Sequence, residues 1–142
     1  MTTDTLTIRD IVDAANDAWC RGDVEGVLEQ YVEDLTYWSN VGNYDGSALT
    51  LIGKPALRTL LQSLHATLEG STVTEHFQVR DGVARALIGF YIRHRQTGLI
   101  LSGTYRQVMT FRENKIERIE QYHDGARTSA FWRLVAREMN LA

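Results

Sequence analysis

The chain has 142 residues, of which 44% are hydrophobic and 23% are charged, and its formal net charge is −3. This length and composition are typical of one globular domain that can fill a core, so we expect a single domain over residues 1–142. Lys and Arg do not exceed Asp and Glu, which argues against a nucleic-acid partner because binding to phosphates needs a basic excess.

Targeting, disulfide and cofactor signals are missing from the sequence. No apolar run approaches the length of a membrane span, and the first ten residues lack the basic and apolar regions of a signal peptide. Cys20 is the only cysteine, so no internal disulfide can form and a cytoplasmic location is expected. The histidines show no metal-ligand spacing, and no Gly-rich phosphate motif occurs. We therefore expect no membrane partner, no metal and no cofactor.

The first part of the chain is predicted to be helical. Apolar residues recur at helical spacing between Ile8 and Trp19, and Gly22 is expected to end this helix. Asp23 is expected to cap a short second helix, whose apolar stripe extends over residues 24–31.

A short strand, a loop and a third helix are predicted next. Leu35–Ser39 has the composition of a strand, and residues 40–48 are rich in Asn, Gly, Asp and Ser, which is typical of a loop. Pro55 stands where the first turn of a helix tolerates proline, and Leu residues recur at helical spacing over residues 57–68.

The second half changes to the two-residue period of β-strands. Four long strands are predicted over residues 72–124, followed by a final amphipathic helix. The breaks at residues 81–82, 96–98 and 113–115 are short and carry Gly or Asn, which suits hairpins. Sequential hairpins predict a strongly curved antiparallel meander.

Alternation divides the strand residues between two faces of this sheet. The interior face is expected to carry Ala86, Ile88, Phe90, Ile92, Ser102, Thr104, Arg106, Val108, Ile119, Gln121 and His123. The other face is also partly apolar and is expected to carry Leu87, Tyr91, Leu101, Tyr105, Met109 and Tyr122. Since both faces need cover, we expect helices on one and a second subunit on the other, which is a homodimer through the sheet. Ile116 and Ile119 differ in parity, and a bulge between them would place both inward.

The element order and two segments, "RGDVEGVLEQYVEDLTYW" and "NKIERIEQYHD", resemble the nuclear transport factor 2-like superfamily, and within it the SnoaL-like polyketide cyclase and ketosteroid-isomerase-like branch. The resemblance covers the chain from Ile8 to about Phe131. It implies an α+β, cone-shaped fold, in which a strongly curved antiparallel sheet and N-terminal helices close an apolar cavity, with a C-terminal helix added. Members of the superfamily include isomerases, cyclases, hydrolases, dehydratases and binding modules. The resemblance therefore implies a small-molecule ligand but no particular reaction.

Two of the known family chemistries lack their residues here. At the positions of the isomerase base and its two oxyanion donors stand Ser39, Ala15 and Thr104, which supply neither that base nor a strong acid donor. The family's epoxide hydrolases use Arg-x-Asp on the penultimate strand, whereas here Arg106 is followed two residues later by Val108. Steroid-type isomerisation is therefore not expected, and the hydrolase set is at best half present.

The cyclase branch is the better match. It places its base, an Asp, near the end of the last strand, and Asp124 matches that position. The implied chemistry is cofactor-independent proton abstraction next to a carbonyl group, followed by aldol closure. A carboxylate can do this where an apolar cavity raises its proton affinity, and Arg106 or His123 could hold the developing enolate oxygen. The residues expected to contact the ligand are Trp38, Ile88, Phe90, Thr104 and Tyr122.

Each candidate also has a purely structural explanation. Asp124 precedes the final helix and could simply cap it. A cavity histidine such as His123 is often a satisfied core residue, and Arg106 could pair with Asp124 or Glu75. If these explanations hold, the protein is a non-catalytic small-molecule-binding or assembly module. A carboxylate inside the cavity, near a hydrogen-bond donor, would distinguish the enzyme from the binding module.

Overall fold

The computed structural model describes residues 5–43 and 45–141. These residues form α1 (Thr5–Cys20), α2 (Val24–Leu28), β1 (Tyr31–Ser39), β2 (Leu49–Ile52), α3 (Lys54–Thr67), β3 (Leu68–Arg80), β4 (Val83–His94), β5 (Ile100–Arg112), β6 (Lys115–Tyr122) and α4 (Gly125–Leu141). The expected α+β class, with N-terminal helices, a curved sheet and a C-terminal helix, is confirmed. None of the described helices combines the length and apolarity needed to cross a membrane.

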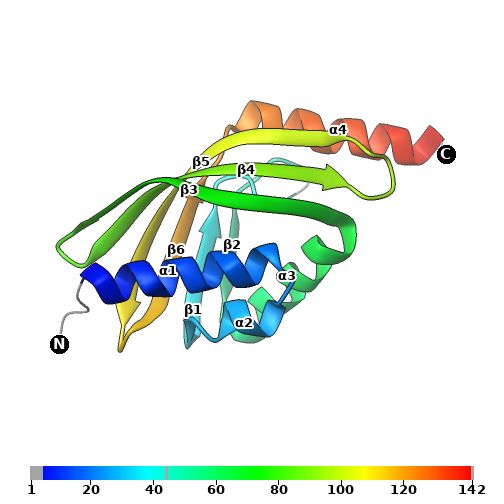
Figure 1. The fold of residues 1–142 in the computed structure, drawn as a ribbon. Helices are drawn as coiled ribbons and strands as arrows, with labels where there is room; N and C mark the ends of the chain where they lie inside the picture. The colour runs from blue at the N-terminus through cyan, green and yellow to red at the C-terminus, as the bar shows by residue number, and fades with distance from the viewer. Residues whose placement is uncertain (1–4, 44, 142) are drawn as a thin grey trace.

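The strands form one curved sheet in the order β2-β1-β6-β5-β4-β3. Figure 1 shows α1 crossing the sheet, α2 and α3 near one end of it, and α4 running alongside the β4–β5 hairpin. Strands β3 to β6 form the expected antiparallel meander, whereas β1 pairs with β6 in parallel. This parallel pair could not be read from hairpin signals, because β1 and β6 are far apart in the sequence.

The helix boundaries follow the sequence signals closely. Gly22 has a positive φ of 72° after α1, and the Asp23 carboxylate accepts a hydrogen bond from the Gly26 N–H (2.9 Å), so both expected boundary residues are confirmed. The second helix is shorter than predicted, because Tyr31 already begins β1. Strand β2 was not predicted, and the apolar stripe assigned to the third helix ends one residue late, because Leu68 begins β3.

The predicted face of β5 was wrong by one residue. Phe90 pairs with Gly103 and Ile88 with Tyr105, so Tyr105 and its odd-numbered neighbours share the inner face. The reason is the length of the β4–β5 loop. The N–H of His94 donates to Leu99 O (2.8 Å), which closes a loop of four residues instead of the expected three. A one-residue shift in register moves every side chain of a strand to the opposite face. The outer face of β5 therefore carries Ser102, Thr104, Arg106 and Val108.

The predicted bulge on the last strand is present. Thr110 pairs with Arg118 and Phe111 pairs with Ile116, which leaves Glu117 as the extra residue. Ile116 and Ile119 are consequently both buried, at 1% and 4% exposure. The same shift directs the inner-face residues at the end of β6 into the interior.

Two apolar clusters hold the helices on the sheet. The larger one joins α1, α2 and α3 to the inner faces of the strands, with Ile8, Val12, Leu35, Leu57 and Met109 among its most buried members. The smaller one packs Phe131 and Val135 of α4 against Leu101 of β5. The space between these two clusters is where the cavity lies.

Candidate functional site

The inner face of the sheet and the helices line a cavity of about 510 Å³. Helix α1 contributes Ala15, Asn16 and Trp19 to its wall, α3 lines one side, and Trp132 of α4 lines another. Cavities of this size hold small organic molecules, and an apolar lining with a few polar groups is typical of such sites.

The lining carries no permanent charge. Among the described residues that form the wall there is no Asp, Glu, Lys or Arg, and His123 is the histidine among them. A buried charged ligand would need an opposite charge to offset its desolvation, so the cavity favours an uncharged molecule.

A chain of hydrogen bonds crosses the floor of the cavity. The Tyr37 hydroxyl donates to Gln121 Oε1 (2.9 Å), and Gln121 Nε2 donates to Gln107 Oε1 (3.1 Å). Gln107 Nε2 in turn donates to the thioether sulfur of Met109 (3.5 Å). The chain joins β1, β6 and β5, so the sheet itself fixes the position of each polar group.

His123 lies at the end of this chain and stacks on an aromatic side chain. Its Nε2 lies 3.4 Å from Gln121 Oε1, and its ring stacks on Tyr105 with centroids 4.4 Å apart. Phe90 lies edge-on to the imidazole, with centroids 6.2 Å apart, and is tilted against Tyr105, with centroids 5.7 Å apart. Burial lowers the pKa of His123 to about 4 from its usual 6.5, so the ring is neutral at pH 7.

The tyrosines of the cavity are also held in their neutral forms. Burial raises the pKa of Tyr37 and of Tyr105 well above the usual value of a phenol. Both hydroxyls therefore remain hydrogen-bond donors throughout the physiological pH range.

The structure brings only part of the sequence-predicted set to the cavity. His123 and Phe90 line it. Ile88 is fully buried, at 0% exposure, and belongs to the packed core of the sheet.

The remaining candidates lie elsewhere. Thr104 and Arg106 are exposed on the outer face of β5, because of the register shift described above. Trp38 and Tyr122 pack against each other, with centroids 5.1 Å apart, away from the cavity lining. Asp124 is exposed, and its carboxylate accepts a hydrogen bond from the Arg127 N–H (3.1 Å) at the start of α4. This is the geometry of a helix N-cap.

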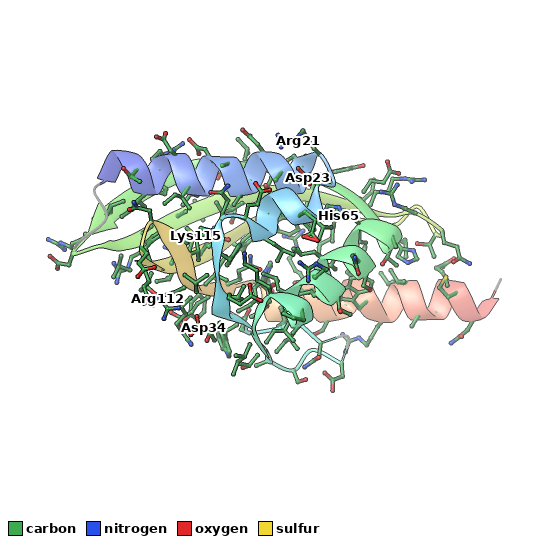
Figure 2. All side chains as sticks on the ribbon, turned by 90° about the horizontal axis from the view of Figure 1, so that it is seen from below. Arg21, Asp23, Asp34, His65, Arg112 and Lys115 are labelled. Atoms are coloured by element: carbon green, nitrogen blue, oxygen red, sulfur yellow. The ribbon has the colours of Figure 1, made fainter. Side chains whose placement is uncertain are left out.

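Charged residues lie outside the lining of the cavity. Figure 2 shows Arg21 and Asp23 on the same side of the view as His65, and Asp34, Arg112 and Lys115 together on the other side. Asp34 accepts a hydrogen bond from Arg112, which also lies 3.8 Å from Glu117. Arg112 is therefore paired with carboxylates on both β1 and β6.

A family model for the SnoaL-like domain matches residues 12–119, well over half of the chain. The chain belongs to the SnoaL-like domain family. A search of curated proteins finds no match.

Solved structures show the same fold at low sequence identity. The SnoaL-like chain superposes on a candidate polyketide cyclase from Xanthomonas campestris with a TM-score of 0.79 and 16% identity, covering 92% of this chain and 99% of that one. TerC, co-crystallised with polyporic acid, gives a TM-score of 0.78 and 15% identity, covering 89% and 98%. An epoxide hydrolase from M. tuberculosis gives 0.75 and 17%, covering 97% and 99%. Other matched structures carry the NTF2-like name, so the expected NTF2-like fold is confirmed.

Of the three positions taken from the isomerase resemblance, two line the cavity of this SnoaL-like protein and one lies on the outer face of the sheet. Ser39 and Ala15 line the cavity, as the resemblance implies. Ser39 is 2% exposed, and the Val41 N–H donates to its Oγ (3.4 Å). Thr104 faces outward. The inward pair offers a hydroxyl and a methyl group, so no carboxylate base stands at the isomerase positions.

Sequence reasoning placed Gln121 and His123 on the interior face but missed other polar residues that line the cavity. Tyr37 shares the parity of Ser39 on β1, so alternation alone could have placed it inward in preference to Trp38. Gln107 and Tyr105 were concealed by the one-residue shift of β5. Asn40 does not line the cavity, but it was grouped with a loop although its side chain holds the backbone of His123.

Proposed function

We propose that the cavity binds an uncharged, mostly apolar molecule with a carbonyl group, and that the protein catalyses cofactor-independent proton transfer next to that carbonyl. The observation that carries the proposal is the placement of His123. It is a neutral imidazole on the cavity wall, stacked on Tyr105 and hydrogen-bonded to Gln121. A small-molecule ligand is also supported by TerC, a structure of the same fold that was co-crystallised with polyporic acid.

The hydrogen bond to Gln121 assigns the two imidazole nitrogens different roles. Gln121 Oε1 can only accept, so the Nε2 of His123 carries the proton. Nδ1 then has the free lone pair and is the basic nitrogen. In the proposed step Nδ1 removes a proton from the carbon next to the carbonyl, which gives an enolate and an imidazolium. The imidazolium returns the proton at another position for isomerisation, or to the new alkoxide after aldol closure.

The low pKa of His123 restricts the substrate class. A base of pKa about 4 is effective only where the C–H bond is already activated, since proton transfer is most efficient between groups of similar pKa. The proposed substrates are therefore ketones whose reacting carbon is also activated by an aromatic ring or by a second carbonyl group.

Asp124 has no role in this proposal, although it was the first candidate from the sequence. Its carboxylate is exposed and accepts a hydrogen bond from the backbone of α4. Proton abstraction needs a base within hydrogen-bonding reach of the reacting proton. His123 lines the cavity, whereas Asp124 does not.

The alternative function is ligand binding without catalysis. The observation that favours it is the neutral lining, since none of the described wall residues is a carboxylate. A neutral, apolar cavity is sufficient for a carrier or sensor of a small molecule.

Hydrogen exchange distinguishes the two functions without knowledge of the natural substrate. We suggest 2-tetralone as the probe, because it is uncharged and apolar, and its C1–H bonds are activated by both ring and carbonyl. In D₂O, NMR should show faster loss of the C1 proton signal with the wild-type protein than with buffer alone. His123→Gln should reduce the exchange rate to that of buffer, while 2-tetralone still binds.

The matched control is Asp124→Asn, which should exchange 2-tetralone at the wild-type rate. Exchange that is lost in Asp124→Asn and kept in His123→Gln would show that the base has been misassigned. Binding of 2-tetralone with no exchange above buffer would establish the binding module instead.

We further propose that a second copy of the chain covers the outer face of the sheet. Leu101, Tyr105 and Met109 were expected there and in fact line the cavity, so the apolar outer surface is smaller than predicted. It still includes exposed Val73, Tyr91 and Tyr122, at 61%, 42% and 41%. Sedimentation should show a dimer for the wild type and for the control Gln62→Glu on α3, and a monomer for Tyr91→Glu. A wild-type monomer at micromolar concentration would refute this proposal.

A further inference from the structure

The hydrogen-bond chain on the cavity floor runs in one direction. Tyr37 and His123 both donate to Gln121 Oε1, and Gln121 Nε2 donates onward to Gln107 Oε1. Each amide oxygen is thus satisfied by the residue before it. The last member of the chain, the Nε2 of Gln107, is the donor that has no oxygen acceptor within the chain.

The acceptor that Gln107 Nε2 finds in the protein is a weak one. It is the thioether sulfur of Met109, at 3.5 Å, and both residues line the cavity. An amide nitrogen has two N–H groups, and a thioether is a poor substitute for oxygen as an acceptor. Gln107 is only 5% exposed, so bulk water has little access to it. A buried amide donor of this kind gains free energy when an oxygen acceptor enters the cavity.

We infer that Gln107 Nε2 is the donor that holds the carbonyl oxygen of the ligand, and that it makes the cavity selective for ketones over hydrocarbons of the same shape. This assignment rests on the proposed function, since it names the residue that donates a hydrogen bond to the carbonyl group of the ligand. It also gives the enolate oxygen a neutral donor as charge develops there, and a preorganised donor that is itself buried is effective in that role.

The rest of the chain explains why a glutamine is suited to this position. Its oxygen is fixed by Gln121 and its backbone by β5, so its amide plane cannot turn to present the oxygen without breaking the bond to Gln121. Tyr37 of β1 and His123, which follows β6, therefore set the donor direction of Gln107 through Gln121. The cavity floor presents a donor to the ligand, and the matching ligand group is an acceptor.

A pair of isosteric probes tests this assignment. 2-Acetylnaphthalene carries the carbonyl oxygen, and 2-isopropenylnaphthalene has a CH₂ group in its place. Their dissociation constants can be measured by quenching of tryptophan fluorescence, because Trp19 and Trp132 line the cavity. The measured quantity is the ratio of the two affinities, which is compared between variants so that differences in probe hydration cancel.

Gln107→Met removes the amide and keeps the length of the side chain. The ketone-to-alkene affinity ratio should fall about two- to tenfold relative to wild type, which is the factor expected for one neutral hydrogen bond. The affinity for the alkene should change little. Gln78→Met is the matched control, since Gln78 is exposed on the outer side of β3, and it should keep the wild-type ratio.

A second measurement uses the wild-type protein, so it can be made even if Gln107→Met fails to fold. The carbonyl stretching frequency of 2-acetylnaphthalene bound to the wild-type protein should be lower than in hexane, because a hydrogen bond weakens the C=O bond. A bound frequency equal to that in hexane, or an affinity ratio unchanged in folded Gln107→Met, overturns the assignment to Gln107. In that case binding of both probes leaves the proposed cavity function intact. If neither probe binds, the assignment and the proposed function fail together.

Discussion

The side-chain amide of Asn40 pairs with the backbone of His123 as a neighbouring strand would. Asn40 Nδ2 donates to His123 O (3.0 Å), and the His123 N–H donates to Asn40 Oδ1 (2.8 Å). The Asn40 N–H also donates to Gln121 O (3.1 Å), so the parallel pairing of β1 with β6 continues past the end of both strands. Asn40 therefore fixes the backbone from which the imidazole of His123 enters the cavity.

Asn40→Ala should destabilise the protein and loosen His123. Loss of two hydrogen bonds predicts a decrease of about 1–3 kcal/mol in the free energy of unfolding, measured by urea denaturation. The His123 ring should also become more accessible to water, so its pKa, followed by NMR, should rise from about 4 toward 6.5.

Two variants control for this prediction. Asn40→Asp keeps the acceptor for the His123 N–H and removes the donor, so it should lose less stability than Asn40→Ala. It is a control for stability alone, because its carboxylate adds a negative charge beside His123 that would itself raise the pKa of the imidazole. Asn140→Ala, in an exposed part of α4, should leave stability and titration unchanged. A His123 titration that is the same in Asn40→Ala and in wild type would contradict a positioning role for Asn40.

Burial of neutral His123 predicts a specific loss of stability in acid. Above pH 6.5 the imidazole is neutral in both folded and unfolded chains, so its contribution is complete there. Between pH 6.5 and about 4 the unfolded chain binds a proton that the folded chain does not, which favours unfolding. The free energy of unfolding of the wild type relative to His123→Gln should therefore fall as pH decreases through this range, and level off below it. A difference that is constant between pH 7 and 4 is the contrary result.

Tyr37→Phe removes one donor from the cavity floor and keeps the ring. The variant should lose about 0.5–1.5 kcal/mol of stability, because Gln121 Oε1 loses its shorter hydrogen bond. Tyr91→Phe is the matched control, since Tyr91 is 42% exposed on the outer face, and its melting temperature should equal that of wild type. Equal melting temperatures for both variants would show that the Tyr37 bond contributes nothing measurable.

The elements that local patterns determine were predictable from the sequence. Asp23 caps α2, and the unequal parity of Ile116 and Ile119 predicted the bulge at Glu117, because each signal depends on residues close together in the chain. Strand β2 is only four residues long, and its main partner lies in β1, so its own sequence carried too little periodicity to predict it.

The site was predicted less well because it depends on register and on contacts between distant segments. The alternation on β5 was recognised correctly. However, the β4–β5 loop is one residue longer than expected, so Gln107 and not Arg106 lines the cavity. Asn40 and His123 are 83 residues apart in sequence, so no local pattern could reveal their pairing. His123 was assigned to the cavity because it follows the inward parity of Ile119, a relationship within one strand.

Asp124 offers a direct comparison between a capping carboxylate and a catalytic one. Its carboxylate accepts a hydrogen bond from the Arg127 N–H, and its backbone O accepts another from the Thr128 N–H (3.0 Å), which is the arrangement at the first turn of α4. Asp124→Ala removes the side-chain acceptor and should lower the free energy of unfolding by about 0.5–2 kcal/mol. Asp124→Asn retains an acceptor oxygen of the same shape, so its stability should differ little from wild type. Urea denaturation of both variants, with exchange of 2-tetralone as the second readout, gives a distinct pattern for each role. A cap lowers stability in Asp124→Ala alone and leaves exchange intact in Asp124→Asn, whereas a base abolishes exchange in both variants.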